Sequence, residues 1–306
     1  MKTSAKRIIA AIIAAITVLA CLTLVGCGKA ATKTVVKVGV CGANNNQWIA
    51  VQKVLDEQGA NIYIELVEFD AYNLPNEALN TGDIDLNAFQ HKAYLASDSK
   101  ANGYDVTSIG DTLIAPLSLY SKKYKSIDEL KAAAASSEKK LLIGVPNDGT
   151  NLSRAIKLLE TAGLIKVDPA AGYTPEISDI TEYLCNIEIS PVSANTLTST
   201  LDDYAASTIN GTYAVPFGLI PSRDALIIEK QSEDGSNPYV NIIAARTKDK
   251  DNETYKKIVA AYQTQLVAEY LLEAYNETFF PAFDYNSEYT VPDTFVSDID
   301  SYKTTK

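Results

Sequence analysis

Residues 36–69 read VKVGVCGANNNQWIAVQKVLDEQGANIYIELVEF, and this stretch decides the fold class. Residues 36–40 are predicted to form a strand, and the alternation of apolar side chains over 62–69 predicts a second one. Between the two strands, residues 47–57 are predicted to form a helix, because the apolar residues Trp48, Val51 and Leu55 recur at the spacing of one helix face. A strand, a helix and a strand in this order predict a βαβ unit with a parallel sheet.

Polar loops follow these two strands, at residues 42–46 and 70–73. Pro75 then opens a short predicted helix, and residues 83–87 supply the end of a third strand. In parallel sheets ligands gather at the carboxyl ends of the strands, so these three strand ends mark the expected binding edge.

His91, the one histidine in 306 residues, lies directly after the third strand end, between Phe89 and Tyr94. An imidazole in this setting is consistent with a packed core residue, a catalytic base or one wall of a ligand slot. An unusual residue alone does not decide between these, because structural positions also hold such residues. Tyr72 follows the second strand and could line an apolar slot with the other two aromatic residues, or pack in the core. The sequence around the histidine leaves these alternatives open.

A second α/β series follows the extended stretch 113–120, in which Pro116 suits a crossing between lobes rather than a strand interior. The further predicted helices span residues 126–135, 151–162, 193–203 and 253–275. The further predicted strands span residues 141–145, 184–189, 205–209, 225–229 and 240–245. Residues 210–213 are predicted to cross back. The two expected lobes comprise residues 36–114 with 215–283, and residues 115–214. Small ligands bind in clefts at such domain junctions.

The first 26 residues are typical of a secretory signal peptide. Residues 1–7 carry three cations and no acid, and residues 8–25 are almost wholly apolar. The segment ends in Leu24-Val25-Gly26-Cys27, which resembles the lipobox of bacterial lipoproteins, where cleavage precedes the cysteine and a diacylglyceryl group is attached to its sulfur. Residues 27–35 would then be a lipidated cysteine and a polar linker, with the folded body outside the cytoplasm. An uncleaved membrane helix is the alternative, because the apolar run approaches the ~20 residues that span a bilayer.

The net charge of the chain is −11. An acidic surface argues against binding to nucleic acid or anionic lipid, since both are negatively charged and bind to clusters of Lys and Arg. If Cys21 leaves with the signal peptide and Cys27 is acylated, Cys41 and Cys185 are the remaining thiols. Their wide separation and the absence of metal-ligand spacing predict two unpaired, buried cysteines, with a disulfide between them as the alternative.

Residues 150–154 begin a predicted helix and place Arg154 within its first turn. Free backbone N–H groups and the helix dipole at this end favour an anion, whereas a cation there is unfavourable for the helix itself. The arginine is therefore consistent with a carboxylate or phosphate held between its guanidinium fork and the helix terminus. A solvent-facing arginine is the plainer alternative.

Enzyme motifs fit the sequence poorly. It contains no Gly-x-Ser-x-Gly elbow, no His-Glu-x-x-His zinc motif and no glycine-rich phosphate loop after a strand. His91 has no serine or cysteine in a nucleophile setting, and Asp83 and Asp85 lack companion metal ligands. We therefore expect a binding protein without catalytic residues, metal or cofactor.

Several segments together resemble the MetQ/NlpA family of methionine-binding lipoproteins, the solute receptors of methionine ABC importers. The most specific segment is AFQHKAYL at residues 88–95. The other matching segments are 72–80, 82–85, 115–123, 145–155, 209–214 and 238–243. The resemblance implies a two-lobed periplasmic-binding-protein fold of type II, a Venus flytrap with two interlobe crossings. It further implies capture of L-methionine or a close analogue, and delivery to the permease and ATPase of an importer at the extracytoplasmic face of the cell membrane.

The resemblance also implies a ligand-binding set of seven residues. These are Tyr72, Phe89, His91, Tyr94, Arg154, Asn210 and Asn241. The aromatic residues would stack on the ligand side chain with the histidine at its edge, the arginine would take the α-carboxylate, and the two asparagines would bond the backbone groups of the ligand. A thioether against aromatic faces gains ~0.3 to 1.5 kcal/mol per contact.

The chain departs from the family pattern at the expected rim of the pocket. Loop 41–48 lacks the usual proline, glycine and histidine, Thr212 stands where a second asparagine is usual, Ala93 replaces a proline, and Leu117-Ser118 replaces Met-Gly. A receptor for another apolar amino acid or a short peptide is therefore one alternative, and a surface lipoprotein for adhesion or envelope organisation is another. The tail 284–306 extends beyond the family's usual end and is expected to be a polar, partly disordered arm.

Overall fold

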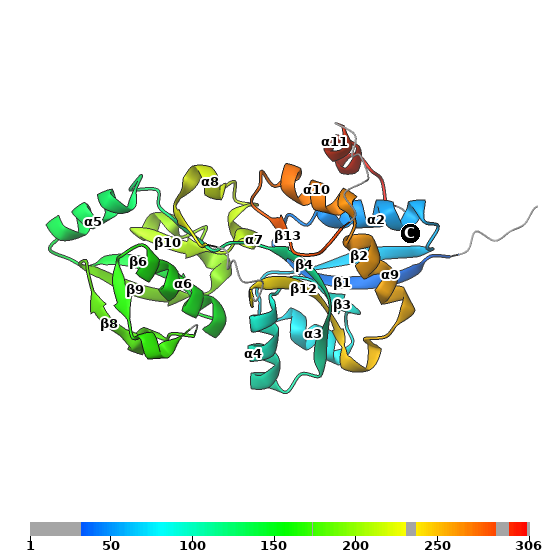
Figure 1. Ribbon diagram of the computed structural model, residues 1–306, viewed down its shortest axis with the longest axis horizontal. Coiled ribbons are helices and arrows are strands. Elements are labelled where there is room, and N and C mark those ends of the chain that lie inside the picture. The colour runs from blue at the N-terminus through cyan, green and yellow to red at the C-terminus, as the bar shows by residue number, and fades with distance from the viewer. Residues whose placement is uncertain (1–31, 173, 231–236, 286–293, 305–306) are drawn as a thin grey trace, which may run out of the picture.

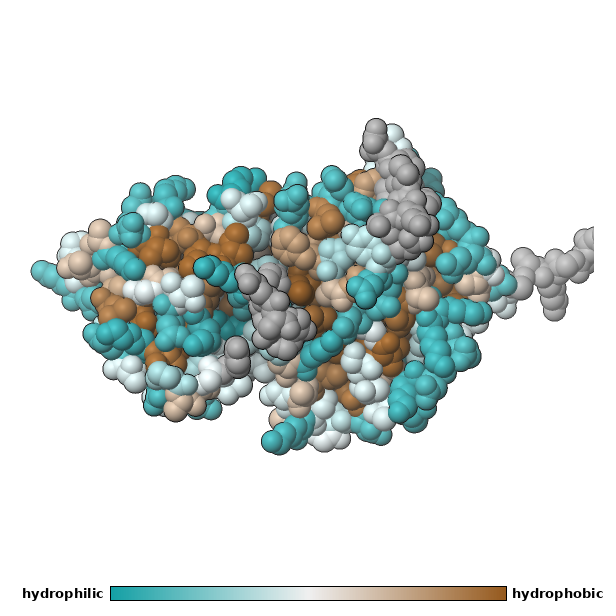
Figure 2. Space-filling model, viewed as in Figure 1, coloured by the Kyte–Doolittle hydropathy of each residue, from teal (hydrophilic) through white to brown (hydrophobic). Residues whose placement is uncertain are grey.

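The computed structural model of the chain describes residues 32–172, 174–230, 237–285 and 294–304. The predicted signal peptide and Cys27 lie outside the described residues. The described chain forms two α/β lobes that lie side by side along the long axis of the molecule (Figure 1), each built around its own sheet. In the space-filling view the two lobes are separate masses with a notch between them along the lower edge (Figure 2).

The first lobe contains a six-stranded sheet with the order β13-β4-β12-β3-β1-β2. Its strands are β1 (Thr34–Cys41), β2 (Ile62–Phe69), β3 (Leu86–Asn87), β4 (Val106–Ile114), β12 (Val240–Arg246) and β13 (Phe280–Pro281). β1 pairs in parallel with β2 and β3, which confirms the predicted βαβ unit, whereas β12 pairs antiparallel with β3 and β4.

Helices cover this sheet on both faces. They are α2 (Gln47–Glu57), α3 (Pro75–Thr81), α4 (Lys92–Asn102), α9 (Glu253–Tyr262) and α10 (Gln265–Ala274). The helix face predicted from spacing is buried: Trp48, Val51 and Leu55 of α2 belong to the main core of this lobe. Pro75 opens α3, where its missing N–H breaks no helical hydrogen bond.

The predicted helix over residues 253–275 is two helices, so that prediction is wrong in the middle of the segment. The chain leaves helical geometry at Gln263, with φ −83° and ψ 47°, and α10 begins after Thr264. The break lets the Gln263 side chain donate to the backbone oxygen of Asp111 in β4 at 2.9 Å. Both helices can therefore follow the curved sheet.

The second lobe contains a five-stranded sheet with the order β11-β5-β10-β6-β9. Its strands are β5 (Ser118–Tyr120), β6 (Leu141–Pro146), β9 (Ile187–Val192), β10 (Ala206–Ile209) and β11 (Ala225–Ile228), and β7 (Ile165–Val167) pairs with β8 (Ile180–Tyr183) in a small hairpin. Its helices are α5 (Ile127–Ser136), α6 (Gly149–Thr161), α7 (Gly211–Ala214) and α8 (Pro221–Asp224). Short 3-10 turns lie at Pro169–Ala171, Ile177–Asp179, Ala194–Thr196, Leu201–Asp203 and, in the first lobe, Thr247–Asp249.

The helix predicted over residues 193–203 is wrong, because only two short turns form there. The hydroxyl of Thr196 donates to the backbone oxygen of Ser193 at 2.7 Å, and that of Thr200 donates to the backbone oxygen of Thr196 at 2.8 Å. Such local side-chain bonds compete with regular helix in a segment rich in Ser and Thr.

The chain passes from the first sheet to the second through residues 115–117 and returns between β11 and β12. The predicted return at 210–213 is wrong, and so is the assignment of residues 225–228 to the first lobe. β11 pairs antiparallel with β5, and Leu226 and Ile227 pack against the core of the second lobe. The glycine-containing segment after β10 therefore forms α7 within the second lobe rather than a hinge.

Residues 294–304 of the C-terminal tail pack against the first lobe, so the prediction of a polar, partly disordered arm is wrong for this part. Helix α11 (Phe295–Asp300) contacts α2 and α10, and its Ile299 is fully buried. The hydroxyl of Tyr302 donates to Asp56 of α2 at 2.8 Å. The apolar side chains of α11 share one face, and that pattern distinguishes it from a solvated arm.

Cys41 and Cys185 are both unpaired, as predicted. Cys41 is buried at the end of β1, whereas Cys185 is partly exposed, so the prediction of two buried thiols holds for the first only. In the part of the chain that the structure describes, no helix combines the length and the apolar character needed to cross a membrane.

Candidate functional site

A cavity lies between the two lobes, and it is lined by all seven of the predicted binding residues. Its void volume is about 340 Å³, part of which is open to solvent. The first lobe contributes Tyr72, Phe89, His91, Tyr94 and Asn241, and the second lobe contributes Arg154 and Asn210. The predicted set therefore converges on one place from both lobes.

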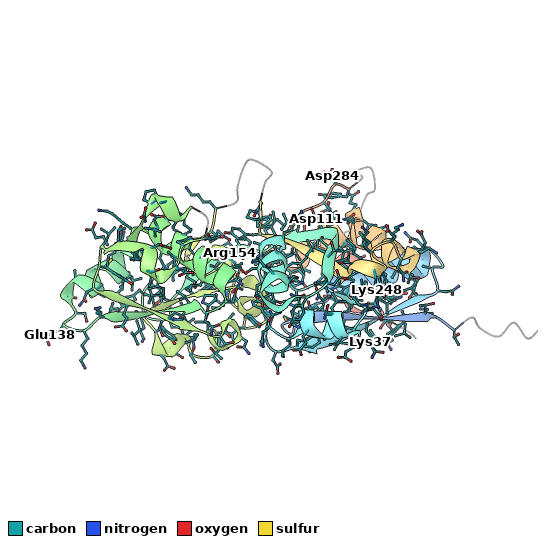
Figure 3. The ribbon with its side chains drawn as sticks, turned by 90° about the horizontal axis from the view of Figure 1, so that it is seen from below. Lys37, Asp111, Glu138, Arg154, Lys248 and Asp284 are labelled. Carbon is teal, nitrogen blue, oxygen red and sulfur yellow. The ribbon has the colours of Figure 1, made fainter. Side chains whose placement is uncertain are left out.

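The elements of the two lobes explain this convergence. Tyr72 lies in the loop after β2 and Phe89 lies directly after β3, at the carboxyl ends of parallel strands. Arg154 projects from α6 at the side of the second lobe that faces the first, whereas Glu138 marks the far end of that lobe (Figure 3).

A buried polar network fixes the segment that carries Phe89 and His91. Asn76 of α3, Asn87 of β3 and Gln90 are at most 2% exposed. Gln90 Nε2 donates to the side-chain oxygens of Asn76 at 2.6 Å and Asn87 at 2.9 Å, and Asn76 Nδ2 donates to Gln90 Oε1 at 2.9 Å. Because each amide bonds the other two, the backbone on either side of Gln90 has one orientation, which turns both neighbouring rings toward the cavity.

Aromatic rings form one wall of the cavity. The ring centroids of Tyr72, Phe89 and Tyr94 lie 5.9 to 6.1 Å apart. Tyr213 of α7 reaches across from the second lobe, with its ring centroid 5.0 Å from that of Tyr72 and its hydroxyl donating to the backbone oxygen of Asp70 at 3.1 Å. Burial raises the pKa of the Tyr72 and Tyr94 hydroxyls, so this wall is uncharged.

His91 caps the first turn of α4 and is held in one tautomer. Its Nδ1 accepts from the backbone N–H of Tyr94 at 3.0 Å, so the neutral ring carries its proton on Nε2, which lies 3.5 Å from Asn151 Oδ1. Burial, and after it the nearby Arg154 cation, lower the pKa of His91 to about 3. An imidazole that is uncharged and already bonded at both nitrogens is a poor general base, which favours the ligand-wall interpretation.

The single histidine makes this protonation state directly measurable. We expect the imidazole signals of His91 in the folded protein to stay constant from about pH 8 to about pH 4.5, because protonation would place a buried charge beside Arg154. An NMR titration of the sole histidine checks this. A midpoint near the ordinary value of ~6.5 would show instead that the ring is solvated.

The same pKa difference predicts how stability depends on pH. The unfolded chain takes up the histidine proton near pH ~6.5 and the folded chain does so only near pH 3. The stability that the neutral ring contributes is therefore present above about pH 6.5 and is lost as the pH falls toward 3. Asparagine keeps an acceptor for the helix cap but does not titrate. As the pH falls over this range, urea unfolding should therefore show wild type losing free energy of unfolding relative to His91→Asn.

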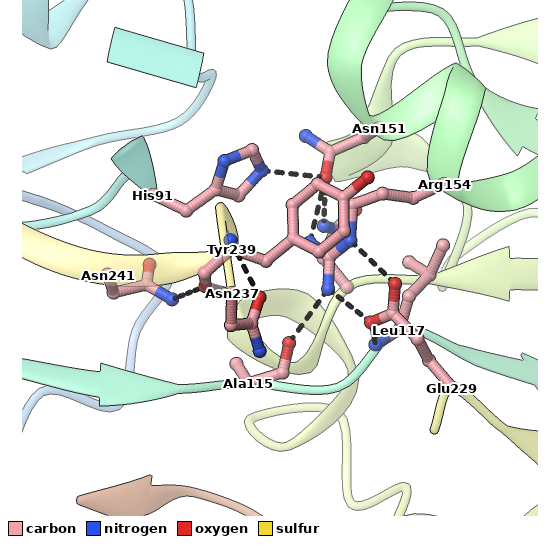
Figure 4. Close-up of polar contacts among 10 residues, drawn as sticks. His91, Ala115, Leu117, Asn151, Arg154, Glu229, Asn237, Tyr239 and Asn241 are labelled. Atoms are coloured by element: carbon pink, nitrogen blue, oxygen red, sulfur yellow. Dashed lines mark hydrogen bonds and ion pairs between the residues drawn. The ribbon is translucent and has the colours of Figure 1, made fainter. Parts of the chain in front are cut away.

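Arg154 is 3% exposed, which excludes the solvent-facing alternative, and its guanidinium makes four hydrogen bonds (Figure 4). Nε and Nη2 donate to the two carboxylate oxygens of Glu229 at 3.0 and 2.5 Å, and Nη2 also donates to the backbone oxygen of Ala115 at 3.2 Å. Nη1 donates to Asn151 Oδ1 at 3.2 Å, and the Tyr239 ring centroid lies 4.4 Å from Cζ. Nε and Nη2 of the fork therefore hold Glu229, and one N–H of Nη1 makes no hydrogen bond to the described residues. That Arg154 takes a ligand carboxylate stays a prediction.

Asn151 connects the polar groups of both lobes. Its Oδ1 accepts from Arg154 and from Asn210 Nδ2 at 2.9 Å, and it faces His91. Its Nδ2 donates to the Asp148 carboxylate at 2.9 and 3.1 Å. Burial raises the pKa of Asp148, and the hydrogen bonds from Asn151 oppose that shift. The orientation of Arg154 thus depends on a chain of bonds that begins at the N-cap of α6.

Sequence reasoning missed several of these residues. Asp148 and Asn151 stand three positions apart at a helix start, which is the spacing of a capping contact, so a local signal was present. Tyr213, Glu229 and Tyr239 lie far from Arg154 or Tyr72 along the chain, and no local pattern marks them.

The two predicted asparagines occupy different positions in the cavity. Asn210 is 8% exposed, and its Oδ1 is buried without a hydrogen-bond partner in the described part of the chain. Asn241 lies on β12, opposite His91 in an isolated antiparallel bridge. Asn210 therefore offers a free acceptor to a donor group of a ligand.

A second cavity adjoins the first behind Phe89 and Asn241. Its void volume is about 480 Å³, and its walls include Asn45, Gln47 and Trp48. Trp48 Nε1 is buried and has no acceptor within the described ranges. The loop 41–48, which departs from the family pattern, therefore lines the second cavity and not the main one.

The chemistry that this arrangement supports is binding. Within the described ranges, no cluster of three or more His, Cys, Asp or Glu side chains is placed to hold a metal ion. An aromatic wall, one partly free guanidinium and amide acceptors suit a small ligand that combines an apolar side chain with charged ends.

Comparison with known proteins agrees with this description. A profile of the NlpA lipoprotein family matches residues 36–283. The D-methionine-binding lipoprotein MetQ of Yersinia pestis is 42% identical over 258 residues, which cover 83% of this chain and 91% of that protein. The protein of the same name from Escherichia coli (strain K12) is 41% identical over 258 residues, with 83% and 91% covered.

Solved structures show the same likeness. A crystal structure of the methionine-binding protein MetQ has a TM-score of 0.75 and 39% identity, covering 82% of this chain and 98% of its own. A nutrient-binding protein from Burkholderia cenocepacia bound to methionine has a TM-score of 0.73 and 37% identity, covering 81% of this chain and 100% of its own.

Proposed function

The chain belongs to the NlpA lipoprotein family, and from this premise we propose that it captures methionine, or a close analogue, between its lobes and delivers it to an ABC importer. Relatives are named for D-methionine binding, and one similar structure is bound to methionine, so both isomers are candidate ligands. Relatives are binding proteins, and we propose the same role, without catalysis, for this chain.

The observation that carries the proposal is that both lobes contribute to one cavity. In the proposed complex, the α-carboxylate meets the open N–H of Arg154 and the amine meets Asn210 Oδ1, while the thioether lies against Phe89. Hydrogen bonds to charged groups contribute ~1.5 to 3 kcal/mol each. A ligand that contacts both lobes binds more tightly when the lobes are closed around it than when they are apart. It therefore shifts the equilibrium between the open and closed states toward the closed one.

Calorimetry on protein refolded to remove bound ligand tests this proposal. We expect heat with L-methionine or D-methionine, and the sulfoxide and a methionyl dipeptide define how narrow the selection is. L-alanine is the matched control, because it lacks the buried thioether chain, which is worth ~2 kcal/mol or roughly thirtyfold in affinity. Absence of heat with every methionine derivative would reject the proposal.

We further propose that Cys27 carries a lipid and that residues 27–35 tether the body at the extracytoplasmic face of the cell membrane. The leader pattern of residues 1–26 and the lipoprotein names of the relatives support this. β1 begins at Thr34, at the end of the first lobe remote from the second (Figure 1). A short tether therefore favours the first lobe as the one nearer the membrane, where the permease of the importer would meet the protein while its ATPase acts from the opposite face.

Removing the lipidated cysteine should detach the protein without changing its binding site. We expect Cys27→Ala to abolish incorporation of labelled palmitate, while the methionine affinity of the isolated folded body stays unchanged. Cell fractionation and metabolic labelling measure this, with Cys21→Ala in the leader as the matched control that keeps the label. Continued labelling of Cys27→Ala would place the anchor elsewhere.

A further inference from the structure

Glu229 ties Arg154 to both interlobe crossings. Its carboxylate accepts from Nε and Nη2 of Arg154, and its Oε2 also accepts from the backbone N–H of Leu117 at 3.0 Å (Figure 4). The backbone N–H of Glu229 in turn donates to the Leu117 oxygen at 2.8 Å. The Glu229 side chain is only 19% exposed. A ligand carboxylate could take Nε and Nη2 of the fork only by displacing Glu229 from both of its bonds to Arg154.

The cavity consequently presents little net positive charge. Arg154 is the one Arg or Lys among the residues that line it, and Glu229 compensates that charge at hydrogen-bond distance. His91 faces the cavity as a neutral ring. Asp148, bonded to the site through Asn151, adds no positive charge in either protonation state. A ligand that is only an anion would meet no uncompensated cation there.

The same cavity favours a group that donates hydrogen bonds. Asn210 Oδ1 is a buried acceptor without a partner in the described chain, while Asn210 Nδ2 is occupied by Asn151. A buried acceptor that stays unpaired is unfavourable, so a protonated amine placed beside it gains a hydrogen bond that a ligand without an amine cannot make.

We propose that Glu229 sets the charge selectivity of the cavity: by holding the fork of Arg154, it makes the site accept a ligand carboxylate only together with a protonated amine. This inference rests on the proposed methionine site and adds the residue that makes the site require both charged ends of the ligand. Glu229 is a positioning residue, because it acts on the ligand through the guanidinium of Arg154.

The probe is 4-(methylthio)butanoate, which is methionine without its amino group and adds no bulk. We expect wild type to bind this anion at least about a hundredfold more weakly than methionine. In Glu229→Gln the guanidinium loses its counter-ion, so the ratio of the two affinities should shrink at least about tenfold. Glu229→Asp keeps the charge and should keep the wild-type ratio, and Glu188→Gln on the exposed side of β9 is the matched control.

The outcomes separate this inference from the proposed function. Equal affinities of wild type for the two ligands would overturn the inference, and so would an unchanged ratio in folded Glu229→Gln, while methionine capture itself would stand. If Glu229→Gln does not fold, Glu229→Asp decides, because the inference requires that this variant keep the wild-type ratio. Wild type that binds neither ligand would overturn the proposed function and this inference with it.

Discussion

Arg154→Ala is expected to weaken methionine binding more than a hundredfold, equivalent to about 2.7 kcal/mol. The variant loses the open N–H that meets the ligand carboxylate. It also leaves Glu229, whose side chain is 19% exposed, without its counter-ion beside the incoming carboxylate. Both effects oppose binding, so the loss should exceed that of one charged hydrogen bond, ~1.5 to 3 kcal/mol. Calorimetry with L-methionine measures it.

Two further variants identify the cause of this loss. Arg154→Ala leaves the Glu229 charge unpaired, which should lower the free energy of unfolding. The double variant Arg154→Ala with Glu229→Gln removes that charge, so it should be more stable than Arg154→Ala alone, while its methionine binding stays weak. Lys157 lies on the same helix with its side chain 43% exposed, and Lys157→Ala should leave the methionine affinity unchanged. A loss of less than about tenfold in Arg154→Ala would show that the carboxylate lies elsewhere.

Asn76→Leu is expected to lower the free energy of unfolding by about 3 to 5 kcal/mol. Asn76 is fully buried, and its side chain bonds Gln90, Asn87 and Asp98. Leucine fills a similar volume but leaves the polar atoms of its neighbours unpaired in the core, where each costs ~1 to 3 kcal/mol. Urea unfolding followed by circular dichroism measures the change, and methionine affinity should fall with it because the Phe89 segment loses its support.

Asn73→Ala is the matched control, because Asn73 is an exposed asparagine in the loop directly before α3. Its effect on the free energy of unfolding should stay within about 0.5 kcal/mol. If Asn76→Leu also stays within that range, the amide network does not hold the segment, and another contact must orient Phe89 and His91.

The parts of the fold that the sequence predicted are those with local signals. The bounds of α2 and β2 match the prediction because helix spacing and strand alternation are strong there and flanked by polar loops. The cavity residues could be grouped because Tyr72 and Phe89 follow strand ends, and the family resemblance supplied the rest.

The remaining parts depend on contacts between distant segments. β11 was placed in the wrong lobe, because an apolar strand does not indicate which sheet it will join. The pairing of Arg154 with Glu229 across 75 residues could not be inferred either. It shows that the charge of Arg154 is compensated by Glu229 within the protein, whereas the sequence suggested a guanidinium free to hold a ligand anion with both arms. Helix α11 was missed because a short apolar face at the end of a polar tail carries little signal.

A crystal structure of the complex with L-methionine would show where and how the ligand binds. We predict methionine in the interlobe cavity, with its carboxylate within hydrogen-bond distance of Arg154 Nη1, its amine at Asn210 Oδ1, and Glu229 still bonded to the fork. Methionine bound outside this cavity, or a cavity without methionine at saturating concentration, would contradict the claim.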